Sequence, residues 1–215
     1  MGPLSDRYGN IQRLELILES ENDSANRYKV SKQADVLMLF YLFSAEELGA
    51  LFKRLGYPFE YETIPRNVSY YASRSSHGST LSRVVHAWVL ARSNRPRAMT
   101  YFEQALQSDV SDIQQGTSAE GLHLGAMAGT LDFVKRVLMG IEVAGDVLRL
   151  NPELPPEIKR FEMSMRYRGH SLDLQVTGNM LTVRDRDHGA TPISLQVGKQ
   201  IHKFEAGSTR AFKLS

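Results

Sequence analysis

The stretch Phe161–Tyr167, which reads FEMSMRY, alternates apolar with polar side chains and decides the fold of the second part of the chain. Alternation with a period of two is the pattern of a strand that buries one face. The same pattern recurs further along the chain, at Leu172–Val176, Met180–Val183 and Ile193–Val197. Turn sequences such as Gly178-Asn179 separate these runs and predict hairpins. Residues 141–215 are therefore predicted to form an antiparallel sheet or a small antiparallel β-sandwich.

The apolar residues before residue 140 recur at helical spacing instead. Segments with this period cover residues 37–44, 45–55, 64–71, 81–91, 98–105 and 122–138, and the last is expected to break at Gly129. Short links such as Gly56-Tyr57-Pro58 separate the segments. Because short links place consecutive helices antiparallel, residues 1–140 are predicted to form a domain of helical hairpins. The proline-rich segment Asn151–Pro156 feeds the β domain that follows.

The composition excludes several classes of protein. The chain has 215 residues, and its balanced charge, with a net value of +2, gives no reason to expect a nucleic-acid partner. It contains no cysteine, which excludes disulfides and thiolate zinc sites and fits a reducing compartment. The longest apolar run, Val36–Phe43, is far shorter than the ~20 residues that a bilayer requires. With no signal-peptide pattern, the expected location is cytoplasmic, without a membrane partner.

The segment Arg74–Ser82, RSSHGSTLS, concentrates hydroxyl and basic side chains just before a predicted helix. The first-turn N–H groups of a helix lack internal partners, and the helix dipole favours negative charge there. Arg74 and His77 can add charged donors, so the segment is a candidate anion site. The alternative is that Ser79 or Thr80 only caps the helix.

Lys32 and Gln33 precede the most apolar segment of the chain, Val36–Phe43. A helix this apolar is expected to be buried nearly all round, which places the two polar residues near the interior. An ammonium and an amide together suit sugar hydroxyls or a phosphate. The alternative is an exposed first turn in which Ser31 is the N-cap.

Glu120 and His123 lie three residues apart at the start of the last helical segment, so they share one face. Such a pair can bind a metal or relay a proton, but no third ligand accompanies it and no metal is expected. A capping box of Thr117 with Glu120 explains the same residues without function.

The remaining histidines are assigned by their surroundings in the sequence. His86 lies among apolar residues of a predicted helix and is expected in the core or an interface. His170, His188 and His202 lie at turns or on polar faces of the strand region and are expected to be solvated.

Three segments, in this order, resemble glycoside hydrolase family 65, which includes the maltose, trehalose and kojibiose phosphorylases. They are Val30–Leu37, Tyr70–Ser82 and Thr117–Gly129, and the resemblance covers roughly residues 8–185. Family members have an N-terminal β-sandwich, a catalytic (α/α)6 barrel and a small C-terminal β domain. The resemblance therefore implies that residues 1–140 are the later part of the barrel and that residues 141–215 are the C-terminal domain.

The resemblance also implies two groups of binding residues. The substrate-binding group comprises Lys32, Gln33, Glu120 and His123, of which Lys32 and Gln33 line the sugar site. The phosphate side comprises Ser75, Ser76, His77 and Ser79. Inorganic phosphate is the expected co-substrate, with no other cofactor. No catalytic residue is assigned, because the family's general acid is a glutamate upstream of the matched part, and inverting cleavage needs that acid to protonate the glycosidic oxygen.

The resemblance thus implies the C-terminal portion of a family 65 phosphorylase or hydrolase that acts on α-glucosides such as trehalose or maltose, and that is inactive alone. The expected ligands are an α-glucoside or a glucose phosphate. Two alternatives stay open, a non-catalytic carbohydrate-binding or interaction module and one half of a split enzyme. Without the other half of the barrel, Val36, Leu39, Phe40 and Phe43 are expected to be uncovered, which predicts a homo-oligomer or an N-terminal partner chain.

Overall fold

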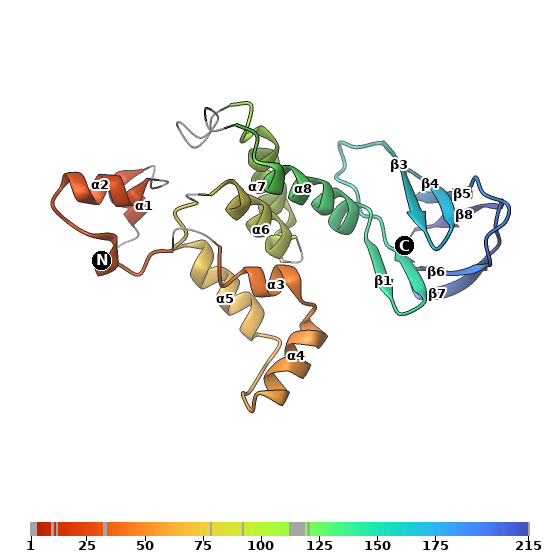
Figure 1. Cartoon of the computed structure of the whole chain (residues 1–215), viewed down its shortest axis with the longest axis horizontal. Coiled ribbons are helices and arrows are strands. Elements are labelled where there is room, and N and C mark those ends of the chain that lie inside the picture. The colour runs from red at the N-terminus through yellow and green to blue at the C-terminus, as the bar shows by residue number, and fades with distance from the viewer. Residues whose placement is uncertain are drawn as a thin grey trace. The chain divides into compact units, whose positions relative to one another are not determined.

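The structure is a computed structural model, which describes residues 4–9, 11, 13–31, 34–77, 79–91, 93–111, 119 and 121–214 (Figure 1). The chain separates into two compact units, Met1–Phe133 (the helical unit) and Val134–Ser215 (the β unit). This division is one of compactness, and the domain boundary predicted after residue 140 stays a prediction. None of the described helices is long and apolar enough to cross a bilayer.

The helical unit contains a helix for each of the segments that the sequence predicts, although the last predicted segment continues past the end of the unit. Its elements are α1 (Leu4–Tyr8), α2 (Leu14–Ser20), the 3-10 turn η1 (Ala25–Arg27), α3 (Met38–Leu42), α4 (Ala45–Arg54), α5 (Thr63–Ala72), α6 (Thr80–Leu90), α7 (Arg95–Gln107) and α8 (Leu124–Phe133). Local sequence sets several of the ends. Ser44 and Glu47 form a capping box at the start of α4, and Gly56 follows its end with a φ of +77°.

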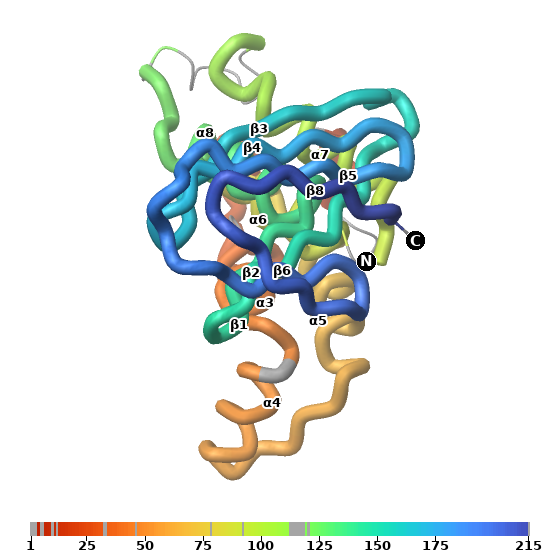
Figure 2. Tube along the Cα trace, turned by 90° about the vertical axis from the view of Figure 1, so that its right-hand side faces the viewer, coloured from red at the N-terminus to blue at the C-terminus, as the bar shows by residue number. Residues whose placement is uncertain are grey.

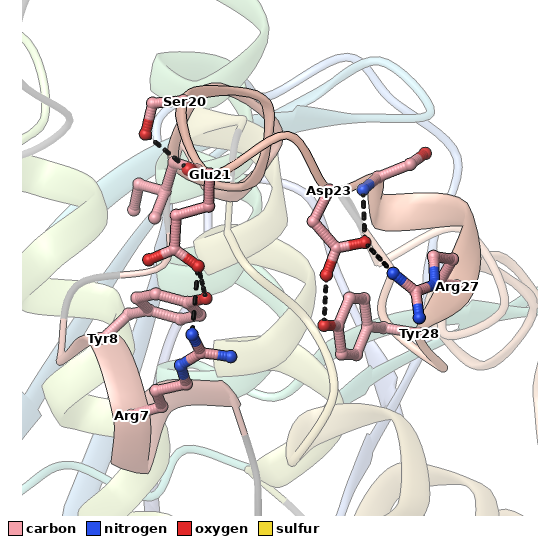
Figure 3. Close-up of polar contacts among 9 residues, drawn as sticks. Arg7, Tyr8, Ser20, Glu21, Asp23, Arg27 and Tyr28 are labelled. Carbon is pink, nitrogen blue, oxygen red and sulfur yellow. Dashed lines mark hydrogen bonds and ion pairs between the residues drawn. The ribbon is translucent and has the colours of Figure 1, made fainter.

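The N-terminal helices are joined by polar contacts (Figure 3). Glu21, just after α2, accepts hydrogen bonds from Arg7 at 3.0 Å and from the Tyr8 hydroxyl at 2.6 Å, both on α1. Asp23 accepts from the Tyr28 hydroxyl at 2.5 Å. Glu21 therefore joins α1 to the end of α2.

Helix α6 is the centre of the helical unit and is buried along almost its whole length. It packs against α3, α5, α7 and α8. Val84 of α6 meets Gly129 of α8 so closely that a Cβ atom at Gly129 would lie 2.6 Å from the Val84 Cγ1 atom. The predicted break at Gly129 is therefore wrong. The glycine lets α8 approach α6, and the change of helix type comes later, in the π-helical turn η3 (Val134–Leu138).

The apolar segment Val36–Phe43 does not form a helix buried all round. Its helix, α3, is five residues long and contains no buried residue, whereas Leu37 just before it is fully buried. Leu39 and Phe43 are each 39% exposed, as expected for an uncovered face. Val36 and Phe40, expected to be uncovered too, are half-buried. Of the described elements, α6 is the main packing partner of α3, while Leu39 and Leu42 of this short helix stay exposed.

The β unit folds into two four-stranded sheets, which Figure 2 shows as two layers. The strands are β1 (Ile141–Ala144), β2 (Val147–Leu150), β3 (Arg160–Tyr167), β4 (His170–Thr177), β5 (Met180–Asp185), β6 (Ile193–Val197), β7 (Gln200–Phe204) and β8 (Thr209–Lys213). One sheet has the order β1-β2-β6-β7 and the other β3-β4-β5-β8. Alternate apolar side chains of both sheets form one core, as the period of two predicts.

The two sheets confirm the predicted antiparallel β-sandwich, and the pairing of β2 with β6 is an exception within it. These strands run parallel, in register from Val147 opposite Ser194 to Leu150 opposite Val197. The chain leaves the first sheet after β2, builds β3, β4 and β5 in the second sheet, and returns at β6 in the direction of β2. The other strand pairs of the two described sheets are antiparallel. The hairpin signal at Gly178-Asn179 is confirmed, because β4 and β5 pair on either side of it.

His170 is fully buried, so the expectation that it is solvated is wrong. Its Nδ1 atom lies 2.7 Å from Asp185 Oδ2, and its Nε2 atom lies 2.9 Å from the Thr191 carbonyl oxygen. Because both ring nitrogens meet acceptors, the doubly protonated ring satisfies both contacts. Burial raises the pKa of Asp185, but hydrogen bonds from the Asp187 N–H, from His170 and from the Gly207 N–H outweigh it and hold the pKa below its usual value.

The other two histidines of the β unit lie closer to solvent. His188 is exposed, as expected. His202 is half-buried, with its ring centroid 5.1 Å from that of Phe212.

Candidate functional site

A short parallel bridge between Ser31 and Ser75 brings two of the predicted motifs together. The Ser31 N–H donates to the Arg74 carbonyl at 2.9 Å, and the Ser76 N–H donates to the Ser31 carbonyl at 2.8 Å. Ser31 is therefore part of this bridge, and Leu37 is the residue at the N-cap of α3, so the alternative that Ser31 caps that helix is wrong. Lys32 and Gln33, which follow Ser31 in the sequence, lie outside the described residues.

Ser75 and Ser76 are both buried between α5 and α6 in the chain. The Ser75 hydroxyl donates to the Tyr71 carbonyl at 3.0 Å, so its proton is used within the protein and its oxygen remains an acceptor. Ser79 occupies the N-cap of α6 with an extended backbone, but its side chain makes no capping hydrogen bond. The alternative that Ser79 serves only as a cap is thus not what the geometry shows, since its half-buried hydroxyl is not used by the helix.

The His77 ring is embedded in a polar cluster and does not carry charge at neutral pH. Its Nδ1 lies 3.1 Å from Ser82 Oγ, and its Nε2 lies 3.4 Å from the Tyr101 hydroxyl. Burial lowers the pKa of His77 to about 3, and neighbouring positive charge, including Arg83, acts in the same direction. The expectation that His77 adds a charged donor is therefore wrong. Its φ of +56° is rare for a side chain of this size and marks a strained position.

His86 and Tyr101 complete this cluster around His77, and both were outside the predicted site. The ring centroids of His86 and Tyr101 lie 4.5 and 5.2 Å from that of His77. His86 is fully buried, which confirms its assignment to the core, and its Nδ1 lies 2.8 Å from the Ser82 carbonyl oxygen. The only sequence signal for the cluster is the i, i+4 spacing of Ser82 and His86 on one helix.

Arg83, on the same helix, brings a cationic side chain into the buried region. Burial lowers the pKa of its guanidinium from the usual value, and Tyr101 acts in the opposite direction. In the sequence, Arg83 is a single charge within an apolar helix, and nothing there marks it as a site residue.

Arg74 points to a different place from the one expected. Its guanidinium lies 3.8 Å above the Tyr70 ring centroid and donates to the Tyr70 carbonyl and the Ser73 hydroxyl, both at 2.9 Å. Together with Glu62 and Arg66 it lines a groove of about 560 Å³ along α5. The Arg74 charge is therefore bound to the surface of α5 and is not directed at the buried serines.

His123 is paired with Asp109, which no motif in the sequence marks as a site residue. The Asp109 carboxylate lies 2.6 Å from His123 Nδ1 and accepts the His123 backbone N–H at 2.8 Å. These two contacts, the backbone N–H first, lower the pKa of Asp109. Glu120 and Thr117 lie outside the described residues. In the part of the chain that the structure describes, no group of three or more carboxylate and histidine side chains could hold a metal.

Comparison with protein families gives the class to which this fold and these residues belong. Residues 3–132 match the glycosyl hydrolase family 65 central catalytic domain, and residues 141–203 match the glycosyl hydrolase family 65 C-terminal domain. The chain therefore belongs to glycosyl hydrolase family 65, which confirms the resemblance.

The chain is also similar to individual proteins of known sequence or structure. An uncharacterized glycosyl hydrolase of Mycobacterium tuberculosis is 49% identical over 94% of this chain and 15% of the relative. The trehalose 6-phosphate phosphorylase of Lactococcus lactis is 32% identical over 81% of this chain and 23% of the relative. A solved structure, a putative kojibiose phosphorylase from the human microbiome, shares the fold with a TM-score of 0.67 at 20% identity, over 86% of this chain and 22% of that one. The chain thus spans less than a quarter of the length of these relatives.

Proposed function

We propose that the chain is the C-terminal portion of a family 65 catalytic unit that acts on α-glucosides, and that it carries sugar-side and phosphate-side residues without the general acid. The observation that carries the proposal is the bridge between Ser31 and Ser75. It joins the backbone that leads into Lys32 and Gln33 with the backbone that leads into Ser76. Two motifs that are far apart in the sequence thereby converge on one place, as a substrate site requires.

On the phosphate side, we assign the anion to the start of α6, with Ser75, Ser76, His77 and Ser79 around it. The N-terminal N–H groups of a helix and its dipole favour an anion by about 0.3–1 kcal/mol at an exposed surface and more where the site is partly buried. The Ser79 hydroxyl supports this assignment because it is not used in capping α6. Neutral His77 contributes here by holding the loop against Ser82 and Tyr101.

We assign substrate binding to Lys32, Gln33, Glu120 and His123, with Lys32 and Gln33 on the sugar side. Phosphorylases that act on glucosides are among the relatives, including a maltose phosphorylase of Bacillus subtilis and an alpha,alpha-trehalose phosphorylase of Thermoanaerobacter brockii. In the proposed reaction, a phosphate oxygen attacks the anomeric carbon while a glutamate from the upstream part of the unit protonates the departing oxygen. The products are a glucose 1-phosphate and the free acceptor sugar.

The uncovered face of α3 fits a chain that works as part of a larger assembly. Leu39 and Phe43, together with Leu42 at 59%, expose apolar surface on one short helix. We propose that the upstream part of an (α/α)6 barrel, in the same chain or in a partner, covers this face in the active unit. The cytoplasm is the compartment that we propose, since the chain contains no cysteine.

Phosphate binding by the pure chain tests this proposal. Titration with inorganic phosphate, followed by calorimetry, is expected to show binding that Ser76→Ala and Ser79→Ala each weaken about tenfold, the effect of one hydrogen bond to a charged ligand. Ser111→Ala is the matched control, because the exposed Ser111 hydroxyl bonds only Gln107 in the described chain. Equal phosphate affinities for the unchanged chain and the three variants would refute the assignment of the phosphate site. Release of glucose 1-phosphate from trehalose or maltose by the chain alone would refute the proposal that the chain carries no general acid.

A further inference from the structure

Asp109 and His123 form a two-point contact between the end of one helix and the start of the next. Asp109 follows α7, and His123 immediately precedes α8. Oδ1 of the carboxylate lies 2.6 Å from the ring Nδ1, and Oδ2 accepts the backbone N–H of the same histidine at 2.8 Å. The Asp109 side chain is only 6% exposed, whereas that of His123 is 26% exposed. One carboxylate therefore contacts both the backbone N–H and the ring of His123, and the ring stays partly exposed to solvent.

This contact decides which ring nitrogen carries the proton. The backbone N–H can only donate, so it occupies Oδ2 in every protonation state of the ring. The ionised carboxylate has no proton of its own, and Nδ1 must therefore donate to Oδ1. In the neutral ring, Nε2 is then left as an acceptor. Among the residues that the structure describes, no hydrogen-bond partner of Nε2 is found.

We propose that Asp109 is a positioning residue that holds His123 in the Nδ1–H form, with Nε2 presented to an O–H donor of the substrate. The inference rests on the proposed function, in which His123 is a substrate-side residue. The donor is a hydroxyl, supplied either by the sugar or by hydrogen phosphate. Nothing in the helical period or in the motif around His123 points to Asp109, because the two residues meet only through the fold.

A purely structural clamp and a positioning residue make different demands on the ring. A clamp between α7 and α8 would need only the backbone N–H contact and would tolerate either ring tautomer. A positioning residue must impose one tautomer. The test therefore has to read the ring nitrogens directly, in addition to ligand binding.

The variant Asp109→Asn reverses one of the two contacts while it keeps the size of the side chain. The amide has one accepting oxygen, and the His123 backbone N–H requires it. The NH2 group must then face Nδ1, which becomes an acceptor, and the ring proton moves to Nε2. Long-range proton–nitrogen NMR spectra of the histidine-labelled chain distinguish the two forms. We expect protonated Nδ1 in the unchanged chain and protonated Nε2 in Asp109→Asn.

Two further variants keep the result interpretable. Asp109→Glu retains a carboxylate and is expected to keep the Nδ1–H form, even if Asp109→Asn weakens the fold. Asp132→Asn is the matched control, because Asp132 accepts a hydrogen bond from the Tyr41 hydroxyl at 3.0 Å elsewhere in the helical unit. It is expected to leave the His123 spectrum unchanged.

Binding is measured separately with glucose and with inorganic phosphate. Asp109→Asn is expected to weaken one of the two about tenfold, and the one affected identifies the source of the hydroxyl, while Asp132→Asn changes neither. A protonated Nε2 in the unchanged chain would overturn the proposal, and so would a tautomer change that leaves both affinities intact. If the unchanged chain binds neither ligand, the proposed function fails and the substrate role of Asp109 fails with it, while the NMR spectra still judge its control of the tautomer.

Discussion

Replacing Asp185 by asparagine should destabilise the β unit strongly, because four hydrogen bonds converge on its carboxylate. Oδ1 accepts the backbone N–H groups of Ser171 and Asp187, at 3.2 and 3.1 Å. Oδ2 lies 2.7 Å from His170 Nδ1 and accepts the Gly207 N–H at 3.2 Å. An asparagine offers one accepting oxygen, so in either orientation its NH2 group faces a backbone N–H that can only donate.

The size of the effect follows from the contacts that are lost. A buried N–H without an acceptor costs about 1–3 kcal/mol, and loss of one partner of a buried ion pair costs about 3–5 kcal/mol in total. We take about 3 kcal/mol, the lower end of that range, as the expected loss. For a unit of about 80 residues, each kcal/mol lowers the Tm by about 4–8 °C, so the expected fall is about 12 °C or more.

Differential scanning calorimetry and urea unfolding followed by circular dichroism measure this change. The single tryptophan, Trp88, lies in the helical unit, so its fluorescence shows separately whether that unit is affected. Asp173→Asn is the matched control, since it is the same substitution on the same sheet at a more exposed position that pairs with Arg186 at 3.3 Å. An exposed pair of this kind contributes at most about 1 kcal/mol.

The pH dependence checks the physical cause. The folded-state pKa of Asp185 is lowered, so its contribution is fully present above its unfolded pKa of about 3.9 and is lost as pH falls through the folded value. The stability gap between the unchanged chain and Asp185→Asn should therefore be wide at pH 7 and narrow below pH ~4. The reasoning is refuted if Asp185→Asn is as stable as Asp173→Asn at pH 7, or if the gap is the same at pH 3.

Three further predictions concern single positions. Gly129→Ala should lower the urea midpoint of unfolding measured by Trp88 fluorescence, because a Cβ atom 2.6 Å from buried Val84 overpacks the α6–α8 contact and costs about 1–3 kcal/mol. Adding Val84→Ala should restore part of this loss, and strictly additive effects of the two substitutions would argue against the clash. Gly140→Ala should destabilise the β unit more than Gly145→Ala. Both glycines have a left-handed φ, but only a Cβ atom at position 140 would lie 2.1 Å from the Asn151 carbonyl oxygen. Equal losses of stability for the two variants in calorimetry would show that this clash does not contribute. The His77 ring should stay neutral in NMR titrations of the folded chain down to near its pKa of about 3. The unfolded chain takes up that proton near pH ~6.5, so this residue makes the free energy of unfolding fall as the pH drops below ~6.5. A titration midpoint near ~6.5 for this ring in the folded chain would contradict the prediction.

The period of the apolar residues was sufficient to predict the helices from α3 to α8 and the strands from β3 to β6, because that period reports which face of an element is buried. The stop at Gly56 was readable for the same local reason. The ordered motifs also led to the correct family. These properties depend on residues near one another in the chain, and the sequence contains them explicitly.

Contacts between distant segments were not readable in this way. The parallel pairing of β2 with β6, the burial of His170 against Asp185 and the grip of Asp109 on His123 each join residues from different elements. A strand pattern is equally satisfied by a parallel or an antiparallel neighbour, so only the path of the chain between sheets decides the choice.

The candidate anion site at Arg74–Ser82 shows the same division between local and tertiary information. Its sequence was enough to place hydroxyl groups and a basic residue at the start of a helix, in a family with phosphate-dependent members. Only the tertiary structure buried His77 until it lost its charge and turned Arg74 onto Tyr70. Charge and direction depend on burial and on the groups that pack nearby, and those are set by the assembled fold rather than by the order of the residues.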